Sequence, residues 1–239
     1  MTCRWLICFS FAVACAPAAT LSGKVELRDS QISAVKKGLD QSGVVVSFVP
    51  VKQLAGAAIT VPAKHATMLQ KNKIFQPHVL PVQVGTQIDF PNDDPIFHNA
   101  FSNYSGQVFD VGLYPPGSKR TVKFPKPGVV RVFCNIHAAM SAVIVVLETP
   151  YFGTSGKDGG WQVDLPPGEY EMRVFHERAK ETTLRALSHR VTVGAQGQTM
   201  PSVSISEAGY LPDAHTNKFG KPYAEGSGDD KNYYPGARK

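Results

Sequence analysis

Cysteine is almost absent from this chain once its N-terminal segment is set aside. Cys3, Cys8 and Cys15 lie within the first fifteen residues, and Cys134 is alone in the rest of the sequence. A chain that loses this segment therefore has no second thiol with which to form an internal disulfide. A lone thiol in an oxidising compartment is a liability unless it is buried or bound to a metal.

Charged residues and long apolar segments are also scarce. Charged side chains occupy 18% of the 239 positions, and the chain has no apolar stretch of the length that a membrane span needs. The hydrophobic fraction of 43% excludes a largely disordered protein. The 21 glycines and 18 prolines indicate many turns and no long helices. A chain of this length can form one large β domain or two modest ones.

The first nineteen residues have the parts of an export signal peptide. Arg4 supplies a positive charge, residues 5–16 are apolar, and Ala16-Pro17-Ala18 offers small side chains for cleavage. We therefore expect a periplasmic or secreted protein. Lipidation at Cys15 is an alternative, but the sequence before this cysteine lacks the bulky aliphatic residue of a lipoprotein signal. A transmembrane anchor is a weaker alternative, because the segment is short and no stop-transfer segment follows it.

The charge balance is mildly basic. The whole chain has 25 Lys and Arg against 19 Asp and Glu, and loss of Arg4 with the signal leaves 24 against 19, a formal charge of +5. This excess favours an anionic partner or peripheral association with an anionic membrane surface. Nucleic acid is not expected as a partner, because the basic residues are dispersed and the chain is exported.

Short β-branched and alternating runs recur along the chain. The runs predicted as strands are Val44–Val49, Thr86–Phe90, Val129–Cys134, Ser141–Leu147, Tyr170–Phe175 and Arg190–Val193. Turn sequences such as Pro115-Pro116-Gly117 and Pro166-Pro167-Gly168 separate them. A series of this kind predicts an all-β protein built from sandwiches or barrels.

We expect five segments along the chain. Residues 1–19 are the signal peptide, 20–63 a β lead-in, 64–148 the first β domain, 149–208 a second and smaller β-sandwich, and 209–239 an irregular C-terminal tail. The strands of the lead-in could extend the first sandwich or complete the second. The tail is poor in aliphatic residues, so we expect it to wrap over a surface or to stay mobile.

The strongest chemical signal is the heptapeptide Cys134-Asn135-Ile136-His137-Ala138-Ala139-Met140. It brings a thiolate, an imidazole and a thioether together at the end of a predicted strand. These ligands suit a copper ion that cycles between Cu(I) and Cu(II), and a blue copper site needs a second histidine beside them. His98, which follows a predicted strand and a Pro-bounded loop, is the best candidate. Zinc is the alternative metal, although one cysteine, two histidines and a thioether are not a typical structural zinc set.

The strand before this heptapeptide predicts where the thiol points. In an extended strand Val130, Val132 and Cys134 share one face, while Arg131 and Phe133 share the other. We therefore expect Cys134 to point into the core. The other histidines have no comparable neighbours and are predicted to be surface residues: His65, His78, His176, His189 and His215.

Residues from about His65 to Leu147 resemble a cupredoxin, and the Cys-x-x-His-x-x-Met loop resembles that of amicyanin. The resemblance implies a Greek-key β-sandwich with one type 1 copper ion bound by His98, Cys134, His137 and Met140. It also implies that Asn99 ties the segment of His98 to the Cys134 loop. The later run from Gly159 to Tyr170 resembles a carboxypeptidase-regulatory-like β-sandwich, and the pairing of the two modules resembles exported proteins called methylamine-utilisation-like.

Two functions are therefore predicted as alternatives. The first is a periplasmic carrier of single electrons, not an enzyme, whose partners are redox proteins such as a cytochrome or a dehydrogenase. The second is an exported copper-binding or adhesive surface module without an electron-transfer role. The first alternative predicts an apolar docking patch where two loops meet: Pro95, Ile96 and Phe97 before His98, and Ile136, Ala138 and Ala139 around His137.

Overall fold

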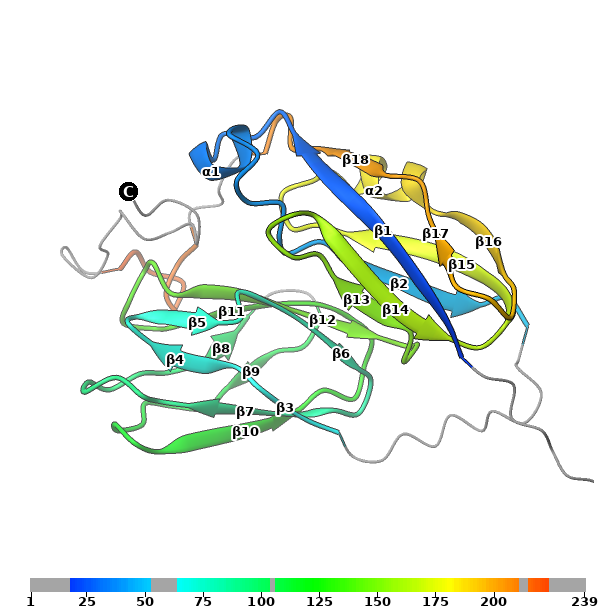
Figure 1. Cartoon of the computed structure of the whole chain (residues 1–239). Helices are drawn as coiled ribbons and strands as arrows, with labels where there is room; N and C mark the ends of the chain where they lie inside the picture. Colours follow the sequence, from blue (N-terminus) through cyan, green and yellow to red (C-terminus); the bar gives the residue numbers. More distant parts are fainter. Residues whose placement is uncertain (1–17, 53–63, 104–105, 211–214, 224–239) are drawn as a thin grey trace, which may run out of the picture.

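The computed structural model describes residues 18–52, 64–103, 106–210 and 215–223. Strands dominate in these ranges, and the helices are the short α1 (Ser33–Lys36) and α2 (Glu181–Leu187) (Figure 1). The all-β sandwich class expected from the sequence is confirmed. The apolar core of the predicted signal peptide and Cys15 lie outside the described residues. Neither helix has the length and hydrophobicity of a membrane span.

The first sandwich contains the middle third of the chain and lies below the second in Figure 1. Its strands are β3 (His65–Thr67), β4 (Leu69–Lys71), β5 (Ile74–Gln76), β6 (Val79–Gln83), β7 (Gln87–Pro91), β8 (Phe101–Ser102), β9 (Phe109–Asp110), β10 (Lys119–Lys123), β11 (Gly128–Phe133) and β12 (Ser141–Leu147). One sheet has the order β10-β7-β3 and the other β6-β12-β11-β8-β9, with β4 and β5 paired separately. Side chains from both sheets share one buried apolar core.

The second sandwich combines strands from before and after the first sandwich in the sequence. Its strands are β1 (Ala19–Arg28), β2 (Val45–Pro50), β13 (Phe152–Thr154), β14 (Gly160–Leu165), β15 (Gly168–Phe175), β16 (His189–Val193), β17 (Gln198–Thr199) and β18 (Val203–Ser206). One sheet places β1 between β14 and β17, with β18 also paired to β1, and the other has the order β13-β2-β15-β16. Of the two placements open for the lead-in, its described strands β1 and β2 therefore pair within the second sandwich.

Strand β12 is apolar along its whole length because both of its faces are covered. Three alternate residues face the core of the first sandwich: Ala142, Ile144 and Val146. Val143 and Val145 face the other way and join Val45 of β2 in a small apolar cluster between the sandwiches. A strand buried on both faces loses the alternation of a half-exposed strand. The run Ser141–Leu147, which ends just before the predicted domain boundary, is thus also a contact between the two sandwiches.

A buried network of charged side chains lies at the same junction. His78 of the first sandwich places Nε2 2.8 Å from Glu177 Oε1, and its Nδ1 lies 3.1 Å from the Ser141 carbonyl. Arg178 donates to Glu177 and to Glu207, both at 3.1 Å. His176 Nε2 lies 2.8 Å from Glu207, and both residues are almost fully buried. The hydrogen bond between His78 and Glu177 therefore links the two sandwiches, and Arg178 pairs with the carboxylates of both Glu177 and Glu207.

The structure corrects the predicted surface placement of three histidines, two of which belong to this network. His65 and His189 are exposed as predicted, whereas His176 is buried, and His78 and His215 are half-buried. The sequence around His176 is polar, which suggested a surface position. Its neighbours Glu177 and Arg178 instead pair with His78 and Glu207 in distant segments, and local sequence does not reveal this pairing.

The Glu177 carboxylate makes the junction sensitive to acid. Burial alone would raise the pKa of Glu177, but the charge and hydrogen bond of His78 and the charge of Arg178 outweigh this and lower it to about 2, from the ordinary 4.5. A lowered pKa stabilises the fold above the unfolded value of 4.5, and this stabilisation is lost as the pH falls towards 2. We expect this residue to contribute on the order of 3 kcal/mol to that loss.

The measurement is urea unfolding of the metal-free protein between pH 6 and pH 2. Glu177→Gln should flatten the part of the profile below pH 4.5, because the amide has no proton to gain. The matched control is Glu181→Gln, which removes an exposed carboxylate on α2 and should leave the profile unchanged. Identical acid profiles for the wild type and Glu177→Gln would contradict the prediction.

Candidate metal centre

His98 reaches the end of the first sandwich from a loop that its neighbours hold rigidly. Its backbone forms an antiparallel bridge with Tyr114, with N–H to O distances of 3.2 and 2.9 Å. The preceding loop is closed by Asn92, whose amide donates to the Ile96 carbonyl at 2.8 Å. The His98 side chain is fully buried. The backbone of His98 is thereby held in place before any metal binds.

Cys134 directly follows strand β11 and points into the core, as the alternation of the sequence predicted. Val130, Val132 and Cys134 are all buried and belong to the same apolar cluster. Burial raises the pKa of the Cys134 thiol, and hydrogen bonds from the backbone N–H groups of Ile136 and Asn99 offset part of this effect. These N–H groups also provide donors for a thiolate when a metal replaces the proton.

Residues Cys134–Met140, here called the ligand loop, form a compact turn between β11 and β12. The Cys134 N–H donates to the Met140 carbonyl at 3.1 Å, and the Met140 N–H donates to the His137 carbonyl at 3.0 Å. This closure returns Met140 to the buried core that contains Cys134. His137 is half-buried, and burial followed by the nearby His98 lowers its pKa to about 4. Metal-free His137 is therefore neutral at pH 7 and has a lone pair available.

The two histidines and the cysteine converge on one point. Cys134 Sγ lies 3.9 Å from His98 Nδ1 and 3.5 Å from His137 Nδ1, and the two imidazole rings are 4.8 Å apart between centroids. One ligand atom from each of the three residues lies within 4.8 Å of the others. In a trigonal site, metal–sulfur and metal–nitrogen bonds of ~2.3 and ~2.0 Å separate the two ligand atoms by roughly 3.7 Å. The donor types and spacings therefore fit a copper ion.

Asp94 is a buried side chain beside His98 that the sequence analysis did not single out. Its Oδ2 accepts a hydrogen bond from His98 Nε2 at 2.7 Å, which leaves Nδ1 directed at Cys134. Burial alone would raise the pKa of Asp94, but backbone N–H groups of Lys73 and Asn72 and the His98 bond hold it below its usual value. A carboxylate behind a histidine fixes the ring and makes its free nitrogen a stronger ligand. The four-residue spacing from His98 was the one available signal.

Asn99 links the two ligand-bearing segments, as the cupredoxin resemblance implied. Its Oδ1 accepts a hydrogen bond from the Asn135 N–H at 3.2 Å, directly after Cys134. Its amide donates to Asp110 at 2.7 Å and to the Gly112 carbonyl at 3.0 Å. This confirms the expected contact. The side chain holds the positions of His98 and Cys134 together through bonds that do not involve a metal.

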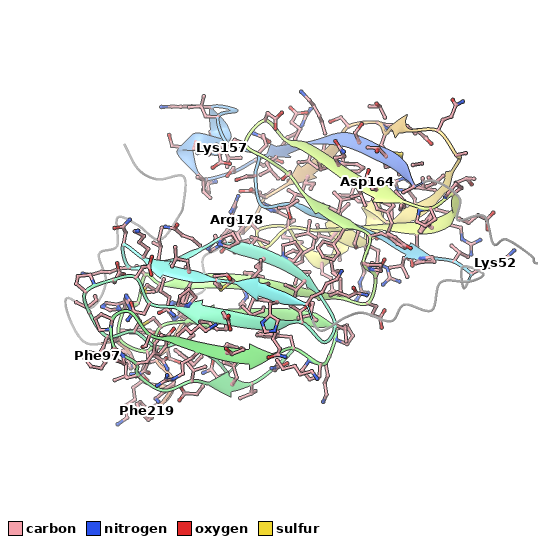
Figure 2. The ribbon with its side chains drawn as sticks, turned by 60° about the horizontal axis from the view of Figure 1, so that its bottom comes forward. Lys52, Phe97, Lys157, Asp164, Arg178 and Phe219 are labelled. Atoms are coloured by element: carbon pink, nitrogen blue, oxygen red, sulfur yellow. The ribbon has the colours of Figure 1, made fainter. Side chains whose placement is uncertain are left out.

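Apolar side chains surround the outer end of this cluster. Phe97, next to His98, is 54% exposed, and Ile136 and Ala138 beside His137 are half-buried. Phe219, from the C-terminal segment, is 69% exposed and lies at the same end of the first sandwich in Figure 2. Large exposed aromatic rings at one end of a domain often mark a surface that meets a partner.

No protein-family model and no curated protein matches the chain, whereas several solved structures do. Among solved structures, the chain is similar to a purple cupredoxin from Nitrosopumilus maritimus, with 23% identity, a TM-score of 0.32, and coverage of 34% of this chain and 99% of that one. It is also similar to a reduced Cu(I) form of an amicyanin variant, with 16% identity, a TM-score of 0.34, and coverage of 43% and 98%.

A third similar structure is the copper-containing nitrite reductase of Thermus scotoductus. The identity is 29% and the TM-score 0.35, over 42% of this chain and 25% of that enzyme. The chain thus spans a quarter of the reductase, and all three likenesses cover less than half of this chain. Because these TM-scores are low, the assignment of a function rests on the geometry of the site.

Proposed function

We propose that this chain is an exported type 1 copper protein of the cupredoxin kind that carries single electrons between redox partners. In this proposal His98, Cys134 and His137 would bind the ion through two imidazoles and a thiolate, and the Met140 thioether would be its weakest ligand. The observation that carries the proposal is the convergence of one thiol and two imidazole nitrogens within 4.8 Å at a largely buried point. The proposal assigns the chain no catalytic residue.

A bound copper ion would supply one-electron chemistry by alternating between Cu(I) and Cu(II). The chain contributes a site that is held in place independently of the metal. Asp94 orients His98, Asn99 joins the segments of His98 and Cys134, and the apolar core around Cys134 excludes water. A donor set that moves little between two oxidation states favours rapid electron transfer, because little reorganisation accompanies each step.

The partners and the location of the protein follow from the same proposal. We infer a periplasmic or secreted carrier that exchanges electrons with a redox protein such as a cytochrome or a dehydrogenase. Without the predicted signal peptide the chain has 24 Lys and Arg against 19 Asp and Glu, a formal charge of +5, which favours acidic partners and peripheral association with an anionic membrane surface. The carboxypeptidase-regulatory-like and methylamine-utilisation-like resemblances stay predictions.

The experiment that tests the proposal is the addition of Cu(II) to the metal-free protein while its visible spectrum is recorded. An intense blue band from thiolate-to-copper charge transfer supports the type 1 site. A weak ligand-field spectrum would favour the alternative function, a copper-binding surface module without electron transfer. Absence of binding would overturn the copper proposal.

Replacing Asp94 by asparagine should weaken the copper site without removing a ligand. The amide is neutral, so the His98 Nδ1 becomes a poorer donor to Cu(II), and we expect about a 10- to 100-fold loss of Cu(II) affinity together with a higher reduction potential. Competition with a chelator and voltammetry measure the two quantities. The control is Asp93→Asn, which removes a half-exposed carboxylate on the adjacent residue. Equal affinities for the two variants would show that Asp94 does not act through His98.

The apolar end of the first sandwich is the proposed docking surface for the redox partner. Ala138→Glu places a charge beside His137, so electron transfer to a soluble c-type cytochrome should slow severalfold while the copper spectrum stays the same. Ala208→Glu is the matched control, because it makes the same change at an exposed position of the second sandwich. Equal rates for the two variants would place the electron exit elsewhere.

A further inference from the structure

The C-terminal segment His215–Tyr223, here called the strap, lies against the ligand loop although it is about eighty residues further along the chain. Figure 1 draws it in orange beside the first sandwich. His215 Nε2 donates to the Ala138 carbonyl at 2.8 Å, and the Tyr223 hydroxyl donates to the Cys134 carbonyl at 3.0 Å. The strap forms neither a helix nor a strand and pairs with no sheet. Side-chain hydrogen bonds of this kind hold it against the ligand loop.

The contacts fall on the loop rather than on the sheets behind it. The Lys218 N–H donates to Asn135 Oδ1 at 3.0 Å, so Cys134, Asn135 and Ala138 each receive one hydrogen bond from the strap. The His215 ring also packs on Phe133, with centroids 4.1 Å apart. A seven-residue loop closed by two backbone hydrogen bonds thus gains three more from a distant segment.

Lys218 connects the strap to both ligand-bearing segments in a closed ring of hydrogen bonds. Its ammonium group binds Asp110 Oδ2 at 2.7 Å, and Asp110 Oδ1 accepts from the Asn99 amide at the same distance. Asn99 accepts from the Asn135 N–H, and Asn135 in turn accepts from the Lys218 N–H. Asn99 directly follows His98 and Asn135 directly follows Cys134. The ring therefore ties the strap to the neighbours of two proposed ligands.

We propose that the strap is a positioning element of the copper centre, which holds the ligand loop in its metal-binding geometry through Tyr223 and Lys218. This inference rests on the proposed function. Neither side chain is among the proposed ligands; each acts through the backbone or the neighbours of Cys134. Removing either contact should let the loop open more often, and the geometry of the thiolate around copper should change with it.

The test compares full-length Tyr223→Phe/Lys218→Met with the wild type, first without metal. Phenylalanine keeps the ring of Tyr223 but loses the bond to the Cys134 carbonyl, and methionine keeps the length of Lys218 but loses the bond to Asp110. We expect amide hydrogen exchange in residues 135–140 to accelerate about tenfold, while exchange in β7 and β10 stays the same. Lys221→Met, which alters an exposed lysine of the same strap, is the control and should resemble the wild type.

The copper-loaded proteins provide the second measurement. The double variant should show a shifted thiolate-to-copper band and lose copper to a chelator several times faster than Lys221→Met does. Unchanged exchange in residues 135–140 would overturn the proposal, and so would faster exchange with an unchanged spectrum and unchanged copper loss. If none of the proteins binds copper, the proposed function fails. Faster amide exchange in residues 135–140 of the double variant would even then show that the strap restricts opening of the ligand loop.

Discussion

Cys134→Ala should abolish the thiolate-to-copper band completely and leave a folded β protein. The sulfur is the donor of the charge-transfer transition, and among the described residues Cys134 is the one free cysteine. The fold should survive because the core of the first sandwich is apolar and is closed by strand pairing between β11 and β12. Loss of one buried atom should lower the free energy of unfolding of the metal-free protein by about 1 kcal/mol.

Visible absorption after addition of Cu(II) and far-ultraviolet circular dichroism measure the two halves of this prediction. Met140→Leu is the informative comparison, because it replaces the thioether in the same loop by an aliphatic side chain of similar volume. That variant should keep the blue band and raise the reduction potential, since losing a weak axial donor disfavours Cu(II). A blue Cys134→Ala protein would refute the site.

Arg178→Ala should destabilise the protein more than any other single change considered for the second sandwich. Arg178 is 8% exposed, and its guanidinium binds both Glu177 and Glu207, which are themselves largely buried. The variant leaves these carboxylates without their arginine in a region that water reaches poorly. Removing one partner of a buried ion pair costs about 3–5 kcal/mol. Figure 2 places Arg178 between the two sandwiches, so the loss should also weaken their contact.

The control for this prediction is Arg185→Ala. Arg185 pairs with Glu181 on α2, but both side chains are 76% exposed. A surface pair of this kind contributes about 0.5 kcal/mol or less, because solvent screens the charges. Urea unfolding at pH 7 gives both values. Similar losses for the two variants would mean that the junction network does not stabilise the fold.

Local pattern predicted the strands well where one face of a strand is buried and the other is not. Val129–Cys134 was expected as a strand and is found as β11, with Cys134 just beyond its end and pointing into the core. The alternation of β11 succeeds as a signal because the pleat places successive side chains on opposite faces, so the order of residues predicts which of them are buried. The run Ser141–Leu147 is β12, with the expected bounds, and its signal was a different one: a continuous apolar run, since both of its faces are covered.

Pairing between distant segments was not accessible in the same way. The sequence left the lead-in between two sandwiches, because the alternation of a half-buried strand such as β1 does not show which strands it pairs with. The register of Ala19 opposite Leu165 decides the question. Asp94, Arg178 and Tyr223 were missed for a related reason. Each acts through a hydrogen bond to another segment, and a single polar residue in a loop has no pattern that reveals its partner.

The sequence by itself determined the all-β class and the chemical types of the proposed ligands, because alternation and the close spacing of Cys134, His137 and Met140 are local properties. Only the tertiary structure decided which nitrogen of His98 faces Cys134, since Asp94 occupies the other one. It also decided that the strap covers the ligand loop. The physical reason is that hydrogen-bond partners depend on chain folding in three dimensions, whereas the tendency of a side chain to be buried is expressed within a few residues.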